Sequence, residues 1–95
     1  MCTYISLLCF TEQGARNIKK STARALAFDK AAQKAGVEIV AQYWMFGEYD
    51  GLLILSAERE EQVLHCLTEL MAAGNVRSQT LKAFDVKMFN QLTGK

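Results

Sequence analysis

Residues that could take part in chemistry gather in one stretch of this 95-residue sequence, Tyr43-Trp44-Met45-Phe46-Gly47-Glu48-Tyr49-Asp50-Gly51. A carboxylate beside a phenol in apolar surroundings can accept a proton or anchor the polar end of a ligand. Asp residues that flank turns more often bind backbone amides. We therefore favour a structural role, in which Asp50 accepts hydrogen bonds from turn amides or from the Tyr43 hydroxyl and holds a hairpin together.

The one histidine, His65, stands next to Cys66 in a segment with helical periodicity. Adjacent helix positions do not face one another, so their spacing does not predict a nucleophile and its base. We interpret Cys9 and Cys66 as small core residues and Cys2 as a thiol near the chain end. Phosphate-binding glycine loops, dinucleotide fingerprints, paired catalytic carboxylates and metal-ligand spacings are absent from the sequence. The expectation is no catalytic residue, no metal site and no cofactor.

Four basic residues, Arg16, Lys19, Lys20 and Arg24, precede and enter the first long helix. Unpaired N–H groups at a helix start and nearby cations can hold a carboxylate or phosphate. A solvated basic face is the commoner outcome, and the net charge of +1 favours it.

Arg77 and Gln79 are expected to project from a later strand, within reach of a pocket beside Asn75. Arg77 is equally suited to pair with a carboxylate across a subunit interface. The indole of Trp44 is expected to cover the gap left by Gly51 on the neighbouring strand, as a packing device.

Charge and composition narrow the classes of partner. Eleven basic and ten acidic residues provide no field that would attract nucleic acid or an anionic membrane. The apolar fraction of 51% is that of a folded chain, and residues 1–95 are expected to form a single domain. The apolar start is interpreted as a strand rather than a signal peptide. Three cysteines without paired spacing are typical of a reducing compartment, so the predicted location is the cytoplasm.

The pair Gly47-Glu48 lies between two apolar runs and predicts a two-residue type II′ hairpin turn. In that register Trp44 lies opposite Gly51, and side chains alternate between the two faces of the sheet. One face carries Val40, Gln42, Trp44, Phe46, Tyr49, Leu53 and Leu55; the other carries Ile39, Ala41, Tyr43, Met45, Asp50, Leu52, Ile54 and Ser56. Both faces are mostly apolar, which indicates that protein covers both of them.

The remaining elements follow from periodicity and end signals. Strands are expected at residues 3–10, 37–46, 49–56 and 76–84, and a short helix at 86–92. Ser21 or Thr22 is expected to cap a helix that Gly36 closes, and Ser56 to cap a second that Gly74 ends. The order strand-helix-strand-strand-helix-strand predicts an α+β, ferredoxin-like fold, a four-stranded antiparallel sheet with two helices on one face. The other apolar face then needs a second subunit.

The sequence resembles the GYD-domain family of small bacterial and archaeal proteins, named for a Gly-x-Tyr-Asp motif present here as Gly47, Tyr49 and Asp50. Further matching marks, in chain order, are Thr3-Tyr4-Ile5, Thr11 with Gln13-Gly14, Asn17 with Ser21 and Arg24, Tyr43-Trp44, and Gly74-Asn75-Val76-Arg77 with Thr80 and Ala83. The family is similar to the dimeric α/β-barrel proteins, which associate through their sheets. The resemblance therefore implies a homo-oligomer and brings no settled activity with it.

Three functions are compatible with these features. The favoured hypothesis is a binding, regulatory or assembly module, a homo-oligomer whose sheet interface encloses a pocket for a small molecule. The candidate pocket residues, drawn from both faces, are Tyr4, Ser6, Tyr43, Trp44, Tyr49, Asp50 and Arg77. The alternative is a small cofactor-independent oxygenase, isomerase or cyclase with Asp50 or His65 as base. A sheet packed solid on both faces, without a pocket, would leave a purely structural role.

Overall fold

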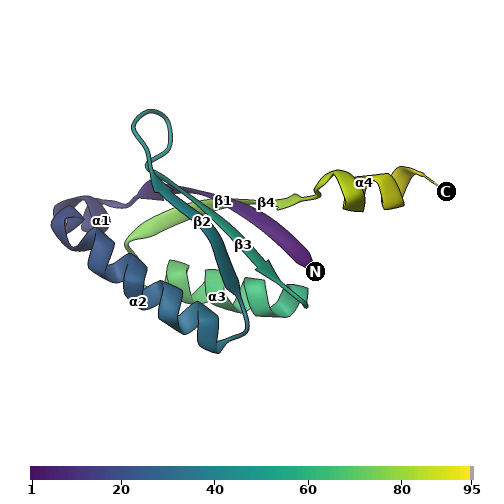
Figure 1. Ribbon diagram of the computed structural model, residues 1–95. Helices are drawn as coiled ribbons and strands as arrows, with labels where there is room; N and C mark the ends of the chain where they lie inside the picture. The colour runs from purple at the N-terminus through teal and green to yellow at the C-terminus, as the bar shows by residue number, and fades with distance from the viewer. Residues whose placement is uncertain (95) are drawn as a thin grey trace.

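The computed structural model describes residues 1–94, and Figure 1 shows a sheet layered on two helices. The elements in order are β1 (Cys2–Phe10), α1 (Glu12–Arg16), the 3-10 turn η1 (Ile18–Lys20), α2 (Ser21–Lys34), β2 (Glu38–Trp44), β3 (Gly51–Ala57), α3 (Glu60–Ala72), β4 (Val76–Ala83) and α4 (Val86–Thr93). The strands pair antiparallel in the order β2-β3-β1-β4. The predicted ferredoxin-like fold is confirmed.

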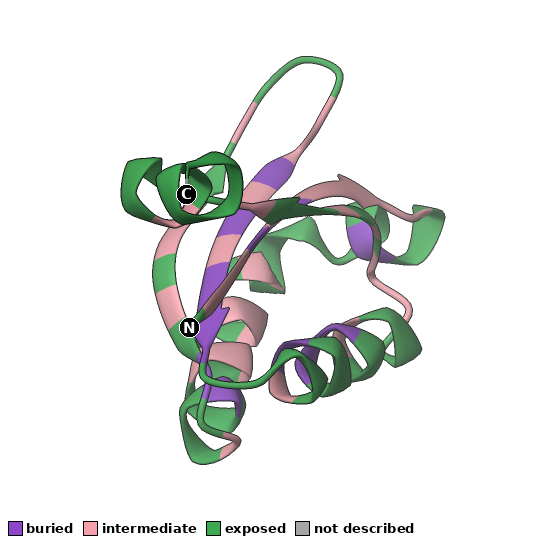
Figure 2. Ribbon diagram, turned by 90° about the vertical axis from the view of Figure 1, so that its right-hand side faces the viewer, coloured by how far each residue is buried: buried purple, intermediate pink, exposed green. Residues whose placement is uncertain are grey.

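The core lies between the sheet and helices α2 and α3. Alternate strand residues such as Tyr4, Leu53 and Leu55 point toward the helices and are buried, because side chains of a strand alternate between its faces. The helices contribute Ala32 from α2 and Val63 from α3, both fully buried. Figure 2 shows this arrangement, with buried positions along β3 and on helix turns that face the sheet.

The predicted pairing of β2 with β3 is correct at the hairpin end and wrong beyond Val40. Tyr43 pairs with Leu52 and Trp44 with Gly51, as expected. A β-bulge between Ile39 and Ala41 then shifts the register, and Ile39 pairs with Leu55 and packs against the core. A bulge adds one residue to one strand and moves every later side chain to the opposite face. Ile39 therefore belongs to the helix side, and Val40 is 52% exposed.

The hairpin connection is wider than the predicted two-residue turn. Residues 45–50 form a loop that projects from the sheet in Figure 1, closed by a 2.8 Å hydrogen bond from the Met45 N–H to the Asp50 carbonyl. Gly47 keeps a positive φ of +137°, as its place in the turn required. Because β2 ends at Trp44 and β3 begins at Gly51, the expected alternation of side chains between the two faces does not extend to Phe46 and Tyr49.

Both predicted serine caps are wrong, whereas both predicted helix ends are correct. α2 begins at Ser21 without a side-chain cap, and Ser56 is buried inside β3. α3 begins later, at Glu60, where the Arg59 N–H donates to the Gln62 side chain. Gly36 and Gly74 follow α2 and α3 with φ near +80°, the left-handed conformation that ends a helix.

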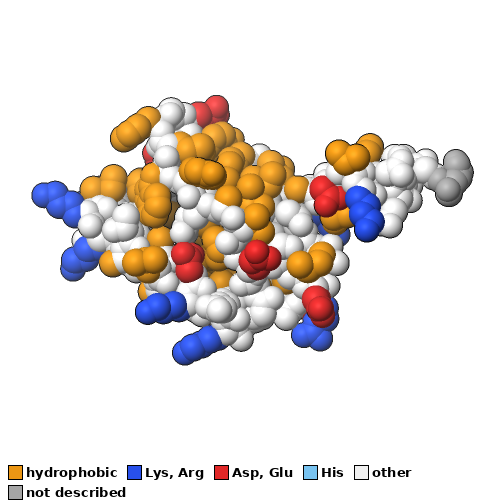
Figure 3. All heavy atoms as spheres, viewed as in Figure 1, with side chains coloured by type: hydrophobic (Ala, Val, Ile, Leu, Met, Phe, Trp, Pro, Cys, Tyr) orange, Lys and Arg blue, Asp and Glu red, His pale blue; other side chains and the backbone are white. Residues whose placement is uncertain are grey.

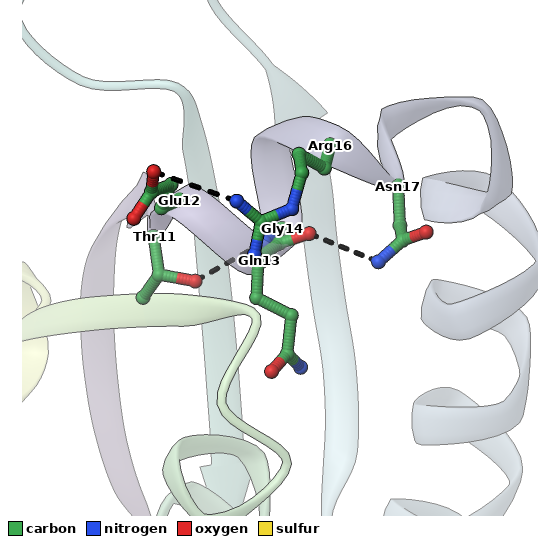
Figure 4. Close-up of polar contacts among 6 residues, drawn as sticks. All are labelled: Thr11, Glu12, Gln13, Gly14, Arg16 and Asn17. Atoms are coloured by element: carbon green, nitrogen blue, oxygen red, sulfur yellow. Dashed lines mark hydrogen bonds and ion pairs between the residues drawn. The ribbon is translucent and has the colours of Figure 1, made fainter.

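Short helix α1 fixes the end of β1 against the start of β4. The Thr11 hydroxyl accepts a 3.1 Å hydrogen bond from the Gly14 N–H and so caps the start of α1 (Figure 4). The same hydroxyl donates to the Gly74 carbonyl, and the Thr11 N–H donates to the Asn75 carbonyl. Gly14 is buried so tightly that an added Cβ would lie 1.9 Å from the Asn75 carbonyl oxygen. α1 therefore needs glycine at this position.

The sheet face away from α2 and α3 is open. Its apolar side chains run across paired strands and comprise Ile5 and Leu7 of β1, Leu52 and Ile54 of β3, Leu81 of β4 and Tyr43 of β2. Tyr43 is 62% exposed and Leu81 is 46% exposed. Figure 3 shows hydrophobic side chains gathered over the strands and on α4, with Lys and Arg mostly around the rim.

α4 projects beyond the end of the sheet rather than over it (Figure 1). Its apolar residues Val86, Phe89 and Leu92 are all more than half exposed. Within residues 1–94, no helix is long and apolar enough to cross a membrane.

Candidate functional site

A cavity of about 330 Å³ lies between the sheet and helices α2 and α3, at the end of the sheet that carries the hairpin. Binding pockets for small molecules usually occupy roughly 300 to 1,000 Å³, so this volume fits a small ligand. The walls comprise Leu8, Phe10, Ser21, Arg24, Ala25, Ala27, Phe28, Gln42, Tyr43, Trp44, Asp50, Gly51, Leu52, Leu53, Glu69, Leu70, Ala73, Asn75 and Val76. Apolar side chains predominate, and polar groups from several elements join them.

Small residues leave this volume unfilled. Gly51 contributes little to this free space, because a Cβ added there would lie 3.3 Å from the Tyr43 carbonyl oxygen and 3.7 Å from side-chain atoms of Leu8. Ala25 on α2 and Ala73 after α3 face the same space. Larger residues at these positions would fill the layer between sheet and helices, as in a close-packed core.

Trp44 joins the sheet to the start of α2 at the side of the cavity. Its indole N–H donates a 2.9 Å hydrogen bond to the Ser21 hydroxyl. Trp44 lies opposite Gly51, as the sequence predicted, and the indole is half exposed. The hydroxyl that was expected to cap α2 instead accepts the hydrogen bond that an indole needs in a partly buried position.

Asp50 holds the hairpin to β1. Its N–H donates to the Leu8 carbonyl, and its Oδ2 accepts the Phe10 N–H at 2.8 Å. The carboxylate thus binds a backbone amide of β1 beyond the last pair of the ladder, Leu8 with Gly51. The favoured structural role is supported, although the partner is a strand amide rather than a turn amide or the Tyr43 hydroxyl. Asp50 also lines the cavity.

The predicted pocket residues divide into three places. Trp44 and Asp50 line the cavity, and Tyr43 borders it although its register with Leu52 places its side chain on the open face. Tyr4 and Ser6 are buried under the helices farther along β1, where the Ser6 and Thr80 hydroxyl oxygens lie 3.1 Å apart. The structure therefore does not bring all the predicted residues into one pocket.

Tyr49 and Arg77 lie on the open side of the sheet. The Tyr49 hydroxyl donates to the Gln79 side chain at 2.9 Å, and Gln79 pairs with Leu7 on β4. Tyr49 was expected on the face of Leu53, which is the helix side, and the wide loop reverses its direction. Arg77 pairs with Cys9 and is exposed.

The expected basic cluster is mostly a solvated face. Lys19 and Lys20 are exposed, and Arg16 pairs with Glu12 at 3.4 Å within α1 (Figure 4). Arg24 differs, because it lines the cavity and donates from Nη1 to the Asn17 carbonyl at 2.8 Å. In the sequence Arg24 was one of four clustered cations and one of the marks shared with the GYD-domain family, and neither feature predicted that it would face a cavity.

The remaining candidate base, His65, and candidate nucleophile, Cys66, are neighbours on α3 and do not face one another. His65 is exposed on α3, whereas Cys66 is buried in the core. Burial, and then the charge of Glu69, raises the pKa of the Cys66 thiol. A buried thiol with a raised pKa is a poor nucleophile. Cys66 acts as a small core residue, as predicted.

Tyr4, Glu60 and Lys82 form a polar cluster at the far end of the helix side. The Tyr4 hydroxyl donates to the Glu60 carboxylate, and Lys82 Nζ lies 3.5 Å from the same carboxylate oxygen. Burial, followed by this hydrogen bond and the charge of Glu60, raises the pKa of Tyr4 to about 12. The hydrogen bond from Tyr4, and then the charge of Lys82, lowers the pKa of Glu60.

We expect Tyr4 to give a late ionisation step, near pH 12, in an alkaline titration followed by phenolate absorbance. Its pKa rises from 10.0 to about 12 on folding, so the unfolded state loses this proton first. Tyr4 therefore stabilises the fold fully below pH 10, and this contribution is lost as the pH rises toward about 12.

Two variants check the assignment of that titration. Glu60→Gln removes the charge beside the phenol and is expected to lower the pKa of Tyr4 while burial keeps it above its ordinary value. Tyr43→Phe removes a 62% exposed phenol and is expected to leave the late ionisation step of Tyr4 in place. A late step that survives Tyr4→Phe would contradict the assignment.

Comparison with known proteins gives both sequence and structural relatives. The model of the GYD domain family matches residues 4–93. A protein of Thermus thermophilus, named glutamine synthetase and cystathionine beta-lyase binding protein, is 32% identical over 87 residues, covering 90% of this chain and 92% of that protein.

Two crystal structures share the fold. FFRP-DM1 superposes with a TM-score of 0.61 at 19% identity, covering 88% of this chain and 100% of that one. TTHA0845 of Thermus thermophilus superposes with a TM-score of 0.58 at 20% identity, covering 90% of this chain and 96% of that one.

Proposed function

Because this chain belongs to the GYD domain family, we propose that it is a homo-oligomeric binding module that regulates or assembles with other proteins and takes up a small molecule. The open apolar sheet face carries the proposal. Ile5, Leu7 and Ile54 lie on the two central strands of that face, and the exposed Leu81 continues the surface onto β4. Contiguous apolar surface of this kind on a small protein marks an interaction site.

The occupant that fits this face best is a second copy. A two-fold pair of sheets buries the same residues on both subunits, so one apolar patch is sufficient for both sides. The patch has few charges, which suits the fully buried centre of an interface. Tyr49 and Arg77 then lie at the rim of this interface, where Arg77 can pair with a carboxylate of the other subunit.

The proposed protein partners follow from the relative in Thermus thermophilus, whose name states that it binds glutamine synthetase and cystathionine beta-lyase. α4 and the hairpin tip remain free for such a partner, since Phe89 and Phe46 are exposed on them. The three cysteines are free thiols, which agrees with the cytoplasm as the place of action.

The proposal is tested with purified protein in two steps. Sedimentation velocity at micromolar concentration is expected to give a homo-oligomer, and immobilised protein is expected to bind purified bacterial glutamine synthetase or cystathionine beta-lyase. A Phe89→Asp variant is the matched probe of α4 in the second step and Leu26→Asp, on the exposed side of α2, is its control. A monomer that binds neither enzyme would overturn the proposal.

A further inference from the structure

Three charged side chains line the cavity between the sheet and the helices. Arg24 comes from α2, Glu69 from α3 and Asp50 from the end of the hairpin loop. Arg24 is a cation and the other two are anions, yet none of the three takes part in an ion pair within residues 1–94. One cation and two anions thus border a single mostly apolar space without neutralising one another.

Each of these groups retains hydrogen-bonding capacity. A guanidinium carries five N–H donors, and the bond from Arg24 Nη1 to the Asn17 carbonyl uses one of them. A carboxylate has two oxygens, and at Asp50 the bond from the Phe10 N–H is accepted by Oδ2, which leaves Oδ1. The cavity therefore offers a site for an anionic group and a site for a cationic group.

The walls between these groups are apolar, with Leu8, Phe28, Leu53, Leu70 and Val76 from five elements. A pure hydrocarbon in this space would desolvate Arg24 and Asp50, which are both half-buried, without pairing their charges, and this is unfavourable. A phosphate-bearing ligand would meet two carboxylates for one guanidinium. The chemistry that satisfies all of these groups is a small zwitterion with an apolar body.

We infer that the cavity binds an α-amino acid with an apolar side chain, its carboxylate at Arg24, its ammonium at Asp50 and Glu69, and its side chain against the apolar walls. The volume of about 330 Å³ admits a molecule of this size. Trp44, held by Ser21, closes the side of the space toward β2. The inference rests on the small-molecule part of the proposed function and gives it a ligand class.

The first test compares L-phenylalanine with two analogues that each lack one charge. Saturation-transfer NMR titrations of the purified protein are expected to show saturable binding of L-phenylalanine. Phenethylamine lacks the carboxylate and 3-phenylpropionate lacks the ammonium, and each is expected to bind about 10-fold more weakly, since a charge-assisted hydrogen bond contributes about that factor.

Variants locate the ligand in the cavity. Arg24→Gln is expected to weaken the binding of L-phenylalanine about 10-fold and to leave the binding of phenethylamine unchanged. Glu69→Gln is expected to weaken L-phenylalanine by the same factor and to leave the binding of 3-phenylpropionate unchanged. Arg16→Gln is the matched control, because Arg16 pairs with Glu12 on α1 and does not line the cavity. Ala25→Phe fills the space and is expected to abolish binding. The charge variants keep the test decisive if Ala25→Phe does not fold.

Absence of L-phenylalanine binding up to about 10 mM, or equal binding by wild type and Arg24→Gln, would overturn the inference. Tighter binding of 3-phenylpropionate or of phenethylamine, lost in Ala25→Phe, would overturn the amino-acid class and leave a small-molecule site in place. Sedimentation of the same samples separates this result from failure of the proposed function, since assembly through the open face does not involve Arg24.

Discussion

Gly14→Ala is expected to lower the free energy of unfolding by about 3 kcal/mol, because the added methyl group would overlap the backbone of Asn75. The new Cβ would lie 1.9 Å from the Asn75 carbonyl oxygen and 2.9 Å from its carbonyl carbon. Neither atom can turn aside as a side chain would. The carbonyl also accepts the Thr11 N–H at 3.0 Å, so moving it breaks the connection between β1 and β4.

Thermal unfolding followed by circular dichroism measures this effect, with an expected fall in Tm of about 15 °C for a domain of this size. Ala15→Ser is the matched control, an exposed neighbour on the same helix, and is expected to stay within about 0.5 kcal/mol of wild type. A Gly14→Ala protein that melts like the control would show that α1 does not pack on Asn75 in this way.

Ile54→Lys is expected to convert the proposed homo-oligomer into a monomer, with a dissociation constant raised at least about 100-fold. Ile54 pairs with Ile5 at the centre of the open face, so a second sheet would bury the lysine without a partner. An unpaired buried charge costs several kcal/mol, and a two-fold interface contains the substitution twice. In the monomer the same lysine faces water, and only strand propensity changes, by up to about 1 kcal/mol.

Sedimentation velocity across a dilution series measures the assembly, and circular dichroism checks that the monomer is folded. Leu81→Lys probes the same face at a position that is already 46% exposed, and Leu26→Lys places the charge on the outer side of α2 as a control. Only the two open-face variants are expected to dissociate. If folded Ile54→Lys and Leu81→Lys sediment as wild type does, the subunits meet through another surface.

Much of the fold was predictable from local patterns. Runs of apolar, strand-forming residues and the turn at Gly47 placed the four strands, and Gly36 and Gly74 marked the ends of α2 and α3. These features depend on residues within a few positions of one another, which is the range over which strand alternation and helix capping act. The pairing of Trp44 with Gly51 was also correct, because the glycine-containing turn sets the register near itself.

The errors in the prediction arose where a distant residue offers a better partner. Ser21 was expected to cap its own helix and instead accepts the indole N–H of Trp44. The bulge at Val40 redirects Ile39 into the core, and no residue type in that stretch marks a bulge. The wide hairpin loop likewise follows from the bonds between Asp50 and β1, whose Phe10 is 40 positions earlier in the chain.

The sequence by itself determined the order of elements, the antiparallel register at the hairpin and the presence of two apolar sheet faces, because these follow from residue type and local spacing. Only the tertiary structure decided that the cavity lies under the helices, that Arg24 and Glu69 meet Asp50 around it, and that Tyr4, Tyr49 and Arg77 lie elsewhere. The physical reason is that a cavity is volume left unfilled by packed elements. Its outline depends on how helices rest on the sheet, and no local pattern encodes that distance.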